Sequence, residues 1–270
     1  MYFLTRIFVI TICLTVLPFV SGQTQVNCEK SRHLLNENGD RFFGSWTGTV
    51  KGIQIAEKKF GESGKLVETW ITLNIDDEGR LLESYLTNDR IPKFGRSAYT
   101  YDPNGRITKR TSYNPDGSAV FEDIYTYDSY GNVLTKHTQN VKSKIVIGTR
   151  KEFKYESPNI FSEYSDGKLV RRIEVVRDDE CRVIKRTLST EGGKLENLIL
   201  LKSDIHGNVI ENIAYSPSGK PAQKLKWEYE YDDRQNWMKK RSFEWHYWDP
   251  TAEYTLVSEE LRTITYATPK

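Results

Sequence analysis

An Asp-x-x-Gly turn that returns at intervals of 26 residues constrains the fold of this chain more than any other feature. In residues 99–107, Asp102 offers a carboxylate to the backbone amides of a turn. Pro103 fixes φ at the next position, and Gly105 supplies the left-handed conformation that closes a hairpin with a bulge. We expect turn-forming structural roles for Asp102, Gly105, Asp128, Gly131, Asp204, Gly207 and Asp232.

A second turn falls about halfway through each repeat, where Gly167, Gly193 and Gly219 again lie 26 residues apart. Each copy is therefore two strands joined by tight turns. Residues 227–231 alternate as a strand requires, with aromatic side chains on one face and acids on the other. The sequence predicts an all-β fold, an antiparallel meander of about seven 26-residue β-hairpin repeats in one long twisted or curled sheet.

We expect three regions along the chain. Residues 1–22 have the basic start, short apolar run and small residues of a cleaved export signal, with an uncleaved anchor as the alternative. Residues 23–60 form an N-terminal segment with a short helical or irregular cap and capping strands. Residues 61–270 form the hairpin-repeat domain. The export signal predicts a periplasmic, secreted or cell-surface protein.

The charge limits which classes of binding partner we expect, and the cysteine content limits the possible disulfide bonds. The net charge of +2 comes without a basic stripe, which predicts no nucleic-acid partner, and membrane contact is expected only through residues 1–22 before cleavage. Removal of that segment leaves Cys28 and Cys181, which an oxidising compartment allows to pair. Two unpaired thiols are the alternative.

The motif Tyr-x-Tyr-Asp-x-x-Gly-Asn/Arg, seen best at Tyr99–Ile107 and Tyr125–Val133, resembles the YD repeat of RHS-type proteins. The resemblance covers roughly residues 70–266. It implies a meandering sheet that winds in a spiral, as in exported or cell-surface bacterial proteins, some of which bind carbohydrate. Large members form shells around a toxin. This chain has too few repeats to close a shell and lacks their C-terminal protease core and toxin domain.

Catalytic and metal-binding motifs are not apparent. The four histidines lie far apart, without the spacing of a zinc site. Acidic groups such as residues 76–78 fit either a calcium site or, as we expect, turn formation by the Asp and solvation of the rest. We therefore expect no cofactor, no metal and no enzymatic activity.

Aromatic residues supply the candidate ligand contacts. The repeat tyrosines fit a structural ladder along the sheet, with an aromatic platform for sugar rings as the alternative. One cluster of aromatic residues, in the last repeat, does not follow the 26-residue period. This C-terminal aromatic group either contacts a ligand or caps the last strand. Its candidate ligand-binding residues are Trp245, His246, Tyr247, Trp248 and Asp249.

These observations predict an exported, non-enzymatic binding or structural module of the YD-repeat type. It would present a sheet surface to a glycan or to another exported or surface protein. Two alternatives stay open. One is a polysaccharide-acting hydrolase that uses acids on the sheet, and the other is a periplasmic lipid or lipoprotein carrier whose sheet holds acyl chains.

Overall fold

The computed structural model describes residues 48–60, 66–88, 95–245 and 253–267, and all regular secondary structure in these ranges is β-strand. The signal segment and the helical or irregular cap predicted before residue 48 lie outside the described residues. The strands are β1 (Val50–Phe60), β2 (Leu66–Ile75), β3 (Leu81–Asn88), β4 (Gly95–Tyr101), β5 (Ile107–Tyr113), β6 (Ala119–Tyr127), β7 (Val133–Asn140), β8 (Val146–Ser157), β9 (Ile160–Ser165), β10 (Lys168–Arg177), β11 (Val183–Ser189), β12 (Leu195–Ser203), β13 (Val209–Tyr215), β14 (Pro221–Tyr231), β15 (Trp237–Trp245) and β16 (Tyr254–Tyr266).

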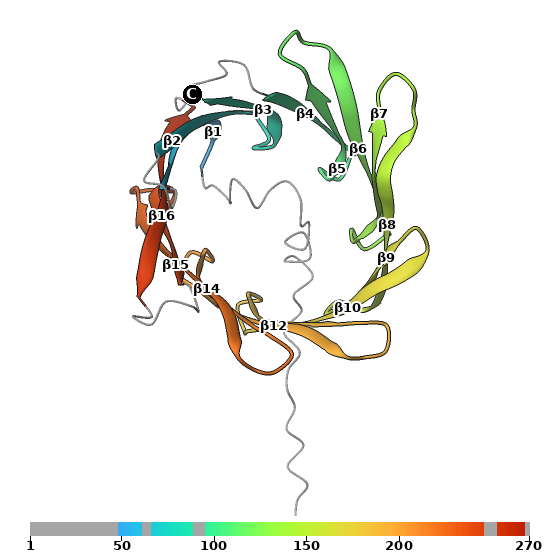
Figure 1. Ribbon diagram of the computed structural model, residues 1–270. Helices are drawn as coiled ribbons and strands as arrows, with labels where there is room; N and C mark the ends of the chain where they lie inside the picture. The colour runs from blue at the N-terminus through green and yellow to red at the C-terminus, as the bar shows by residue number, and fades with distance from the viewer. Residues whose placement is uncertain (1–47, 61–65, 89–94, 246–252, 268–270) are drawn as a thin grey trace, which may run out of the picture.

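The sixteen strands form one closed antiparallel barrel in which each strand pairs with its neighbours in sequence. Figure 1 shows them following one another around a ring, with β16 beside β1. The closing pair runs from Val50 opposite Tyr266 to Lys59 opposite Ser258. The prediction of an open, curled sheet of about seven hairpins is therefore wrong, because the sheet closes on itself.

Closure has a physical cause that acts at both ends of the chain. An open sheet would leave a row of unpaired N–H and C=O groups along β1 and another along β16. Both strands are long, and their pairing satisfies these groups along most of their length. A register shift also accompanies the Asp-x-x-Gly hairpins, as between Thr100 and Tyr101, and such bulges bend and twist the sheet.

The two faces of the barrel differ in burial and composition. The buried apolar side chains all lie on the face that also carries the repeat aromatics Tyr99, Tyr125 and Tyr229. Side chains inside a closed ring converge while those outside diverge, so we call this more buried face the inner face. Two clusters form on it, a β1–β3 cluster (Val50, Ile53, Ile55, Leu73, Ile75 and Leu81) and a β9–β10 cluster (Phe161, Ile173 and Val175).

The outer face is charged, and its charges pair across neighbouring strands. Arg96 on β4 contacts Glu83 on β3, and Arg241 on β15 contacts Glu228 on β14. Exposed ion pairs of this kind contribute little stability each, about 0–1 kcal/mol, but they keep a solvated surface. Water therefore contacts the outer face, and apolar contacts concentrate on the inner face.

Candidate ligand-binding surface of the barrel

The Asp-x-x-Gly turns build one rim of the barrel by a shared geometry. Asp102 Oδ1 accepts hydrogen bonds from the backbone N–H groups of Asn104, at 3.0 Å, and Arg106, at 2.9 Å. Gly105 has φ +77°, a left-handed conformation that favours glycine. Cys181 and Gln235 adopt the same conformation, with φ values of 65° and 66°, although they carry side chains. The turn geometry is therefore kept where the glycine is lost.

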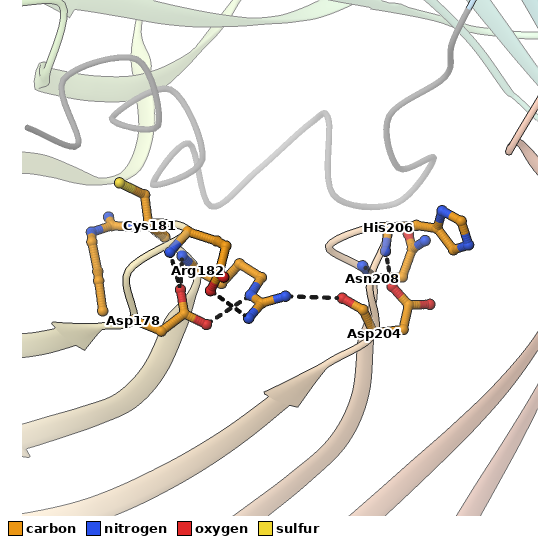
Figure 2. A network of polar contacts seen from close by, with 8 residues as sticks. Asp178, Cys181, Arg182, Asp204, His206 and Asn208 are labelled. Carbon is orange, nitrogen blue, oxygen red and sulfur yellow. Dashed lines mark hydrogen bonds and ion pairs between the residues drawn. The ribbon is translucent and has the colours of Figure 1, made fainter. Parts of the chain in front are cut away.

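Neighbouring turns of this rim are linked to one another, as Figure 2 shows. Arg182 Nε donates to Asp178 Oδ2 at 2.7 Å, and its Nη1 donates to the backbone oxygen of Asp204 at 3.3 Å. Asp204 Oδ1 in turn accepts from the backbone N–H groups of His206 and Asn208, each at 2.9 Å. Asp128, Asp204 and Asp232 each organise the same kind of turn, so the rim is a chain of similar polar units.

The second tyrosine of each Tyr-x-Tyr pair forms a hydrogen bond with the preceding repeat. The acceptor lies either in the Asp-x-x-Gly turn of that repeat or at the start of the strand after that turn. Tyr101 donates to the Leu81 backbone oxygen at 2.7 Å, and Tyr127 donates to that of Ile107 at 2.6 Å. Tyr231 instead donates to Asp204 Oδ2 and accepts from Asn208 Nδ2. These contacts follow the repeat around the rim, as a structural ladder requires.

Cys181 takes part in a disulfide bond, and its partner lies outside the described residues. Cys28 also lies outside them, so the Cys28–Cys181 pairing stays a prediction. The Cys181 turn joins β10 to β11, on the far side of the ring from β1. A bridge there ties the Asp-x-x-Gly rim to a distant part of the chain.

Most charged groups of the inner face are paired. Arg110 contacts Asp123 at 2.6 Å, and Thr138 donates to the same carboxylate at 2.6 Å. Farther round the barrel, Glu163 accepts from Arg171 at 2.7 Å and from Lys151 at 2.8 Å. Lys240 contacts Glu260 at 2.5 Å. Such pairing offsets the cost of removing these charges from water.

Arg262 on β16 departs from this rule. The side chain is 3% exposed, and none of its three guanidinium nitrogens has a hydrogen-bond partner within the described part of the chain. Its Cζ atom lies 3.2 Å from the centroid of the Trp237 ring, a cation–π contact that uses no N–H group. Burial lowers the pKa of Arg262 to about 9, and the nearby Glu260 opposes the shift. The guanidinium therefore stays charged at neutral pH, and no hydrogen bond from it reaches another of the described residues.

Apolar side chains lead away from Arg262 along the inner face. Its opposite residue on β1 is Ile55, a member of the β1–β3 cluster. In the other direction, beyond β15, the inner face of β11 to β14 carries half-buried apolar residues that keep accessible surface. We call these residues the apolar strip: Leu188, Ile199, Leu201, Leu225 and Trp227.

The predicted C-terminal aromatic group is described only in part. Trp245 ends β15 opposite Lys224, and the Lys224 ammonium lies 4.5 Å from the centroid of the indole ring. Trp245 lies on the outer face of the barrel, as Arg241 does. His246, Tyr247, Trp248 and Asp249 lie outside the described residues, so their role as ligand contacts stays a prediction.

Sequence reasoning missed Arg262, although a signal is present. Ser258, Glu260, Arg262, Ile264 and Tyr266 alternate on one face of the last strand, which places an arginine in line with an isoleucine and a tyrosine. Strict alternation along β15 would put Trp237 on the same face as Phe243, but a register shift between Glu230 and Tyr231 puts it on the inner face instead. The bulge therefore brings Trp237 and Arg262 together.

The fold and the site define a class: a closed antiparallel β-barrel with a charged outer face and an aromatic, apolar inner face. Within the described ranges, no helix is long and apolar enough to cross a membrane. Across the same residues, no His, Cys, Asp and Glu side chains gather in groups of three or more that suit a metal ion.

A family model described as "Protein of unknown function (DUF2963)" matches residues 96–139, which cover most of β4 to β7. That match spans two hairpin repeats and a small part of the chain. A comparison with curated proteins gives no match. The resemblance to the YD repeat stays a prediction.

Several solved structures are similar to the chain in part. A porin-like protein from Bacteroides uniformis has a TM-score of 0.40 at 11% identity, covering 82% of this chain and 99% of that one. A domain described as an outer membrane lipoprotein-sorting protein from Vibrio parahaemolyticus has a TM-score of 0.31 at 9% identity, with coverages of 91% and 94%. The Tc holotoxin pore of Photorhabdus luminescens has a TM-score of 0.26 at 14% identity, covering 69% of this chain and 14% of that one. Because these TM-scores are below 0.5, a function must be argued from the barrel itself.

Proposed function

We propose that this chain is an exported, non-catalytic carrier that binds an amphipathic lipid with an anionic head group on the inner face of its barrel. Arg262 would hold the head group, and the apolar strip would hold the acyl chain. The observation that carries the proposal is the buried guanidinium of Arg262, whose donors are unused among the described residues.

The chemistry of Arg262 favours an anion. A guanidinium presents five N–H donors in a planar fork that matches a carboxylate or a phosphate. An unpaired buried charge is costly, and a bound anion would remove most of that cost. Lys240 stands nearby but is engaged by Glu260 at 2.5 Å, so it does not compete for the ligand.

The size of the barrel favours a ligand with an apolar chain. Side chains fill the interior of a barrel of about eight strands, whereas sixteen strands enclose more space than side chains alone can fill. The half-buried residues of the apolar strip present accessible apolar surface to that interior. An acyl chain lying there would gain about 0.8 kcal/mol for each methylene group buried.

Binding of a glycan or of a protein partner is less well supported by the described geometry. Trp245 lies on the charged outer face, and the other residues of the aromatic group are outside the described ranges. The inner face joins a buried cation to apolar surface, which suits a lipid better than a neutral sugar.

Direct binding tests the proposal. The delipidated mature protein is titrated with a fluorescent long-chain fatty acid and with the matched fatty alcohol, and lipids extracted from untreated protein are identified by mass spectrometry. The acid should bind at least about tenfold more tightly, because a hydrogen bond to a charged group contributes about 1.5–3 kcal/mol. Arg262→Met should remove this preference for the acid.

A matched pair of variants on β12 tests the position of the acyl chain. Leu201 belongs to the apolar strip, whereas its neighbour Leu200 is exposed on the outer face. Leu201→Asn should weaken binding of both probes, and Leu200→Asn should leave binding unchanged. Equal effects of the two variants, or turnover of the probe by the protein, would contradict a carrier that binds on its inner face.

A further inference from the structure

The hairpin formed by β7 and β8 carries the longest exposed segment of the described chain. Every residue from 142 to 150 is exposed. Three consecutive apolar residues lie within it, with exposures of 66% for Ile145, 45% for Val146 and 43% for Ile147. Exposed apolar groups of this size on a soluble surface mark contact with a partner or a membrane.

The hairpin extends beyond its neighbour on one side. The last registered pair between β8 and β9 joins Lys151 to Ser165, so Val146 and Ile147 pair only with β7. Figure 1 shows the β7–β8 hairpin, coloured yellow-green, reaching outward from the ring. Its apolar tip therefore stands clear of the neighbouring hairpin.

Basic residues flank the apolar tip in the sequence. The segment 141–151 contains Lys142, Lys144, Arg150 and Lys151 and has no acidic residue. Lys144, in the turn beside Ile145, contacts Glu122 at 3.0 Å. Arg150 contacts Glu152 at 3.8 Å and Lys151 contacts Glu163 on the inner face at 2.8 Å, whereas Lys142 is exposed. A basic, apolar surface matches a bilayer with anionic lipids, where each Lys or Arg near the surface gains about fivefold in affinity.

We propose that the β7–β8 hairpin is a membrane-docking element that inserts Ile145 and its neighbours into the interface of an anionic bilayer. Lys142 and Lys144 in the turn would contact lipid head groups, and the apolar residues would lie at the boundary of the acyl chains. This contact goes beyond the proposed carrier function and does not depend on it. It also extends the sequence-based expectation, which placed membrane contact in residues 1–22 alone.

Vesicle binding by the mature protein tests this proposal. Co-sedimentation with phosphatidylglycerol vesicles should exceed that with phosphatidylcholine vesicles and should fall as salt is added. Ile145→Asp should reduce binding to the anionic vesicles at least about tenfold, because it replaces an inserted apolar group with a charge that the lipid repels. Lys142→Glu should also weaken binding to the anionic vesicles.

Ile205 offers a matched control. It is 89% exposed but lies in the Asp-x-x-Gly turn between β12 and β13, on the opposite rim of the barrel. Ile205→Asp should leave vesicle binding unchanged. In a separate variant, Ile145→Trp, the tryptophan emission should shift to shorter wavelength when anionic vesicles are added.

Two outcomes would overturn the docking proposal. One is equal vesicle binding by the wild type, Ile145→Asp and Ile205→Asp proteins. The other is self-association that Ile145→Asp abolishes, seen by sedimentation velocity, together with an absence of vesicle binding. That second result would make the tip a contact between copies of the chain.

Discussion

Replacing Arg262 with methionine should raise the stability of the delipidated protein. Arg262 is 3% exposed and lacks hydrogen-bond partners among the described residues, so its buried charge has no directly bonded counter-ion among them. Substitution of buried ionic groups by apolar residues of similar volume often stabilises a protein by about 1–4 kcal/mol. Loss of the cation–π contact with Trp237 would offset about 2 kcal/mol of this gain.

Because Arg262 has no hydrogen-bond partner among the described residues, we expect the upper part of this range, about 3–4 kcal/mol, which leaves a net gain of about 1–2 kcal/mol. A chain of this size shifts its Tm by about 2–4 °C for each kcal/mol, so Arg262→Met should melt roughly 2–8 °C higher than the wild type. Differential scanning calorimetry of delipidated samples measures this shift. Adding a fatty acid at about 100 times its Kd should stabilise the wild type by about 2.7 kcal/mol and the variant much less.

Arg110→Met is the matched control for this change. Arg110 also lies on the inner face, but it is paired with Asp123 at 2.6 Å. Its removal leaves a buried carboxylate without its cation and should cost about 3–5 kcal/mol. A loss of stability in delipidated Arg262→Met comparable with that of Arg110→Met would refute the idea that Arg262 lacks a compensating anion.

Three further changes probe the rim and the outer face. Gln235→Gly should stabilise the protein by about 0.5–1 kcal/mol in urea unfolding, because φ at this position is 66°. Tyr231→Phe should cost about 1–3 kcal/mol in the same assay, because it removes the hydroxyl that donates to Asp204. Hydrogen bonds from Gln139 and Lys144 lower the pKa of Glu122 from 4.5 to about 2. The stability this carboxylate contributes is therefore present above about pH 4.5 and lost as pH falls through about 2. The stability difference between wild type and Glu122→Gln, followed by urea unfolding from pH 7 to pH 2, should shrink over that window.

For each of these three substitutions, one result would contradict the prediction. A less stable Gln235→Gly would mean that the glutamine side chain contributes more than the backbone conformation costs. If Tyr231→Phe leaves the free energy of unfolding unchanged, the contact between neighbouring turns contributes no stability. A wild type and Glu122→Gln pair with the same stability difference at pH 7 and pH 2 would show that the Glu122 carboxylate keeps the same pKa on folding.

The rim could be predicted from sequence because its determinants are local. The backbone conformation at residues 102–105 follows from an aspartate, a proline and a glycine within four positions. The contact from the second tyrosine of each pair to the preceding repeat is less local, but it recurs along the chain. Period and local chemistry together therefore identify the hairpins and their tight turns.

Closure of the barrel could not be predicted in the same way. Pairing between β1 and β16 joins residues near the two ends of the chain, and a local period holds no information about which distant strands meet. Strict alternation also fails to place Trp237, since a bulge of one residue reverses the face on which a side chain lies. Arg262 was missed because its environment is created by these two long-range features.

The candidate functional residues lie where the repeat is absent. β16 carries Arg262 and has no Asp-x-x-Gly turn, and the turn between β8 and β9 at residues 158–159 also departs from the motif. In the regular repeats, tyrosine, aspartate and glycine are committed to the rim, which leaves fewer positions free to vary. β16 contacts the rim through Tyr266, which donates to Asp232, and farther along the strand it carries Arg262, which has no hydrogen-bond partner among the described residues. The β7–β8 turn lies on the opposite rim and carries the exposed apolar tip. Both features cost stability, which binding would offset. If so, substitutions in β16 and in the β7–β8 hairpin should alter lipid or vesicle binding with little loss of stability, whereas substitutions at the Asp-x-x-Gly rim should lower stability and leave the affinity of the folded protein unchanged.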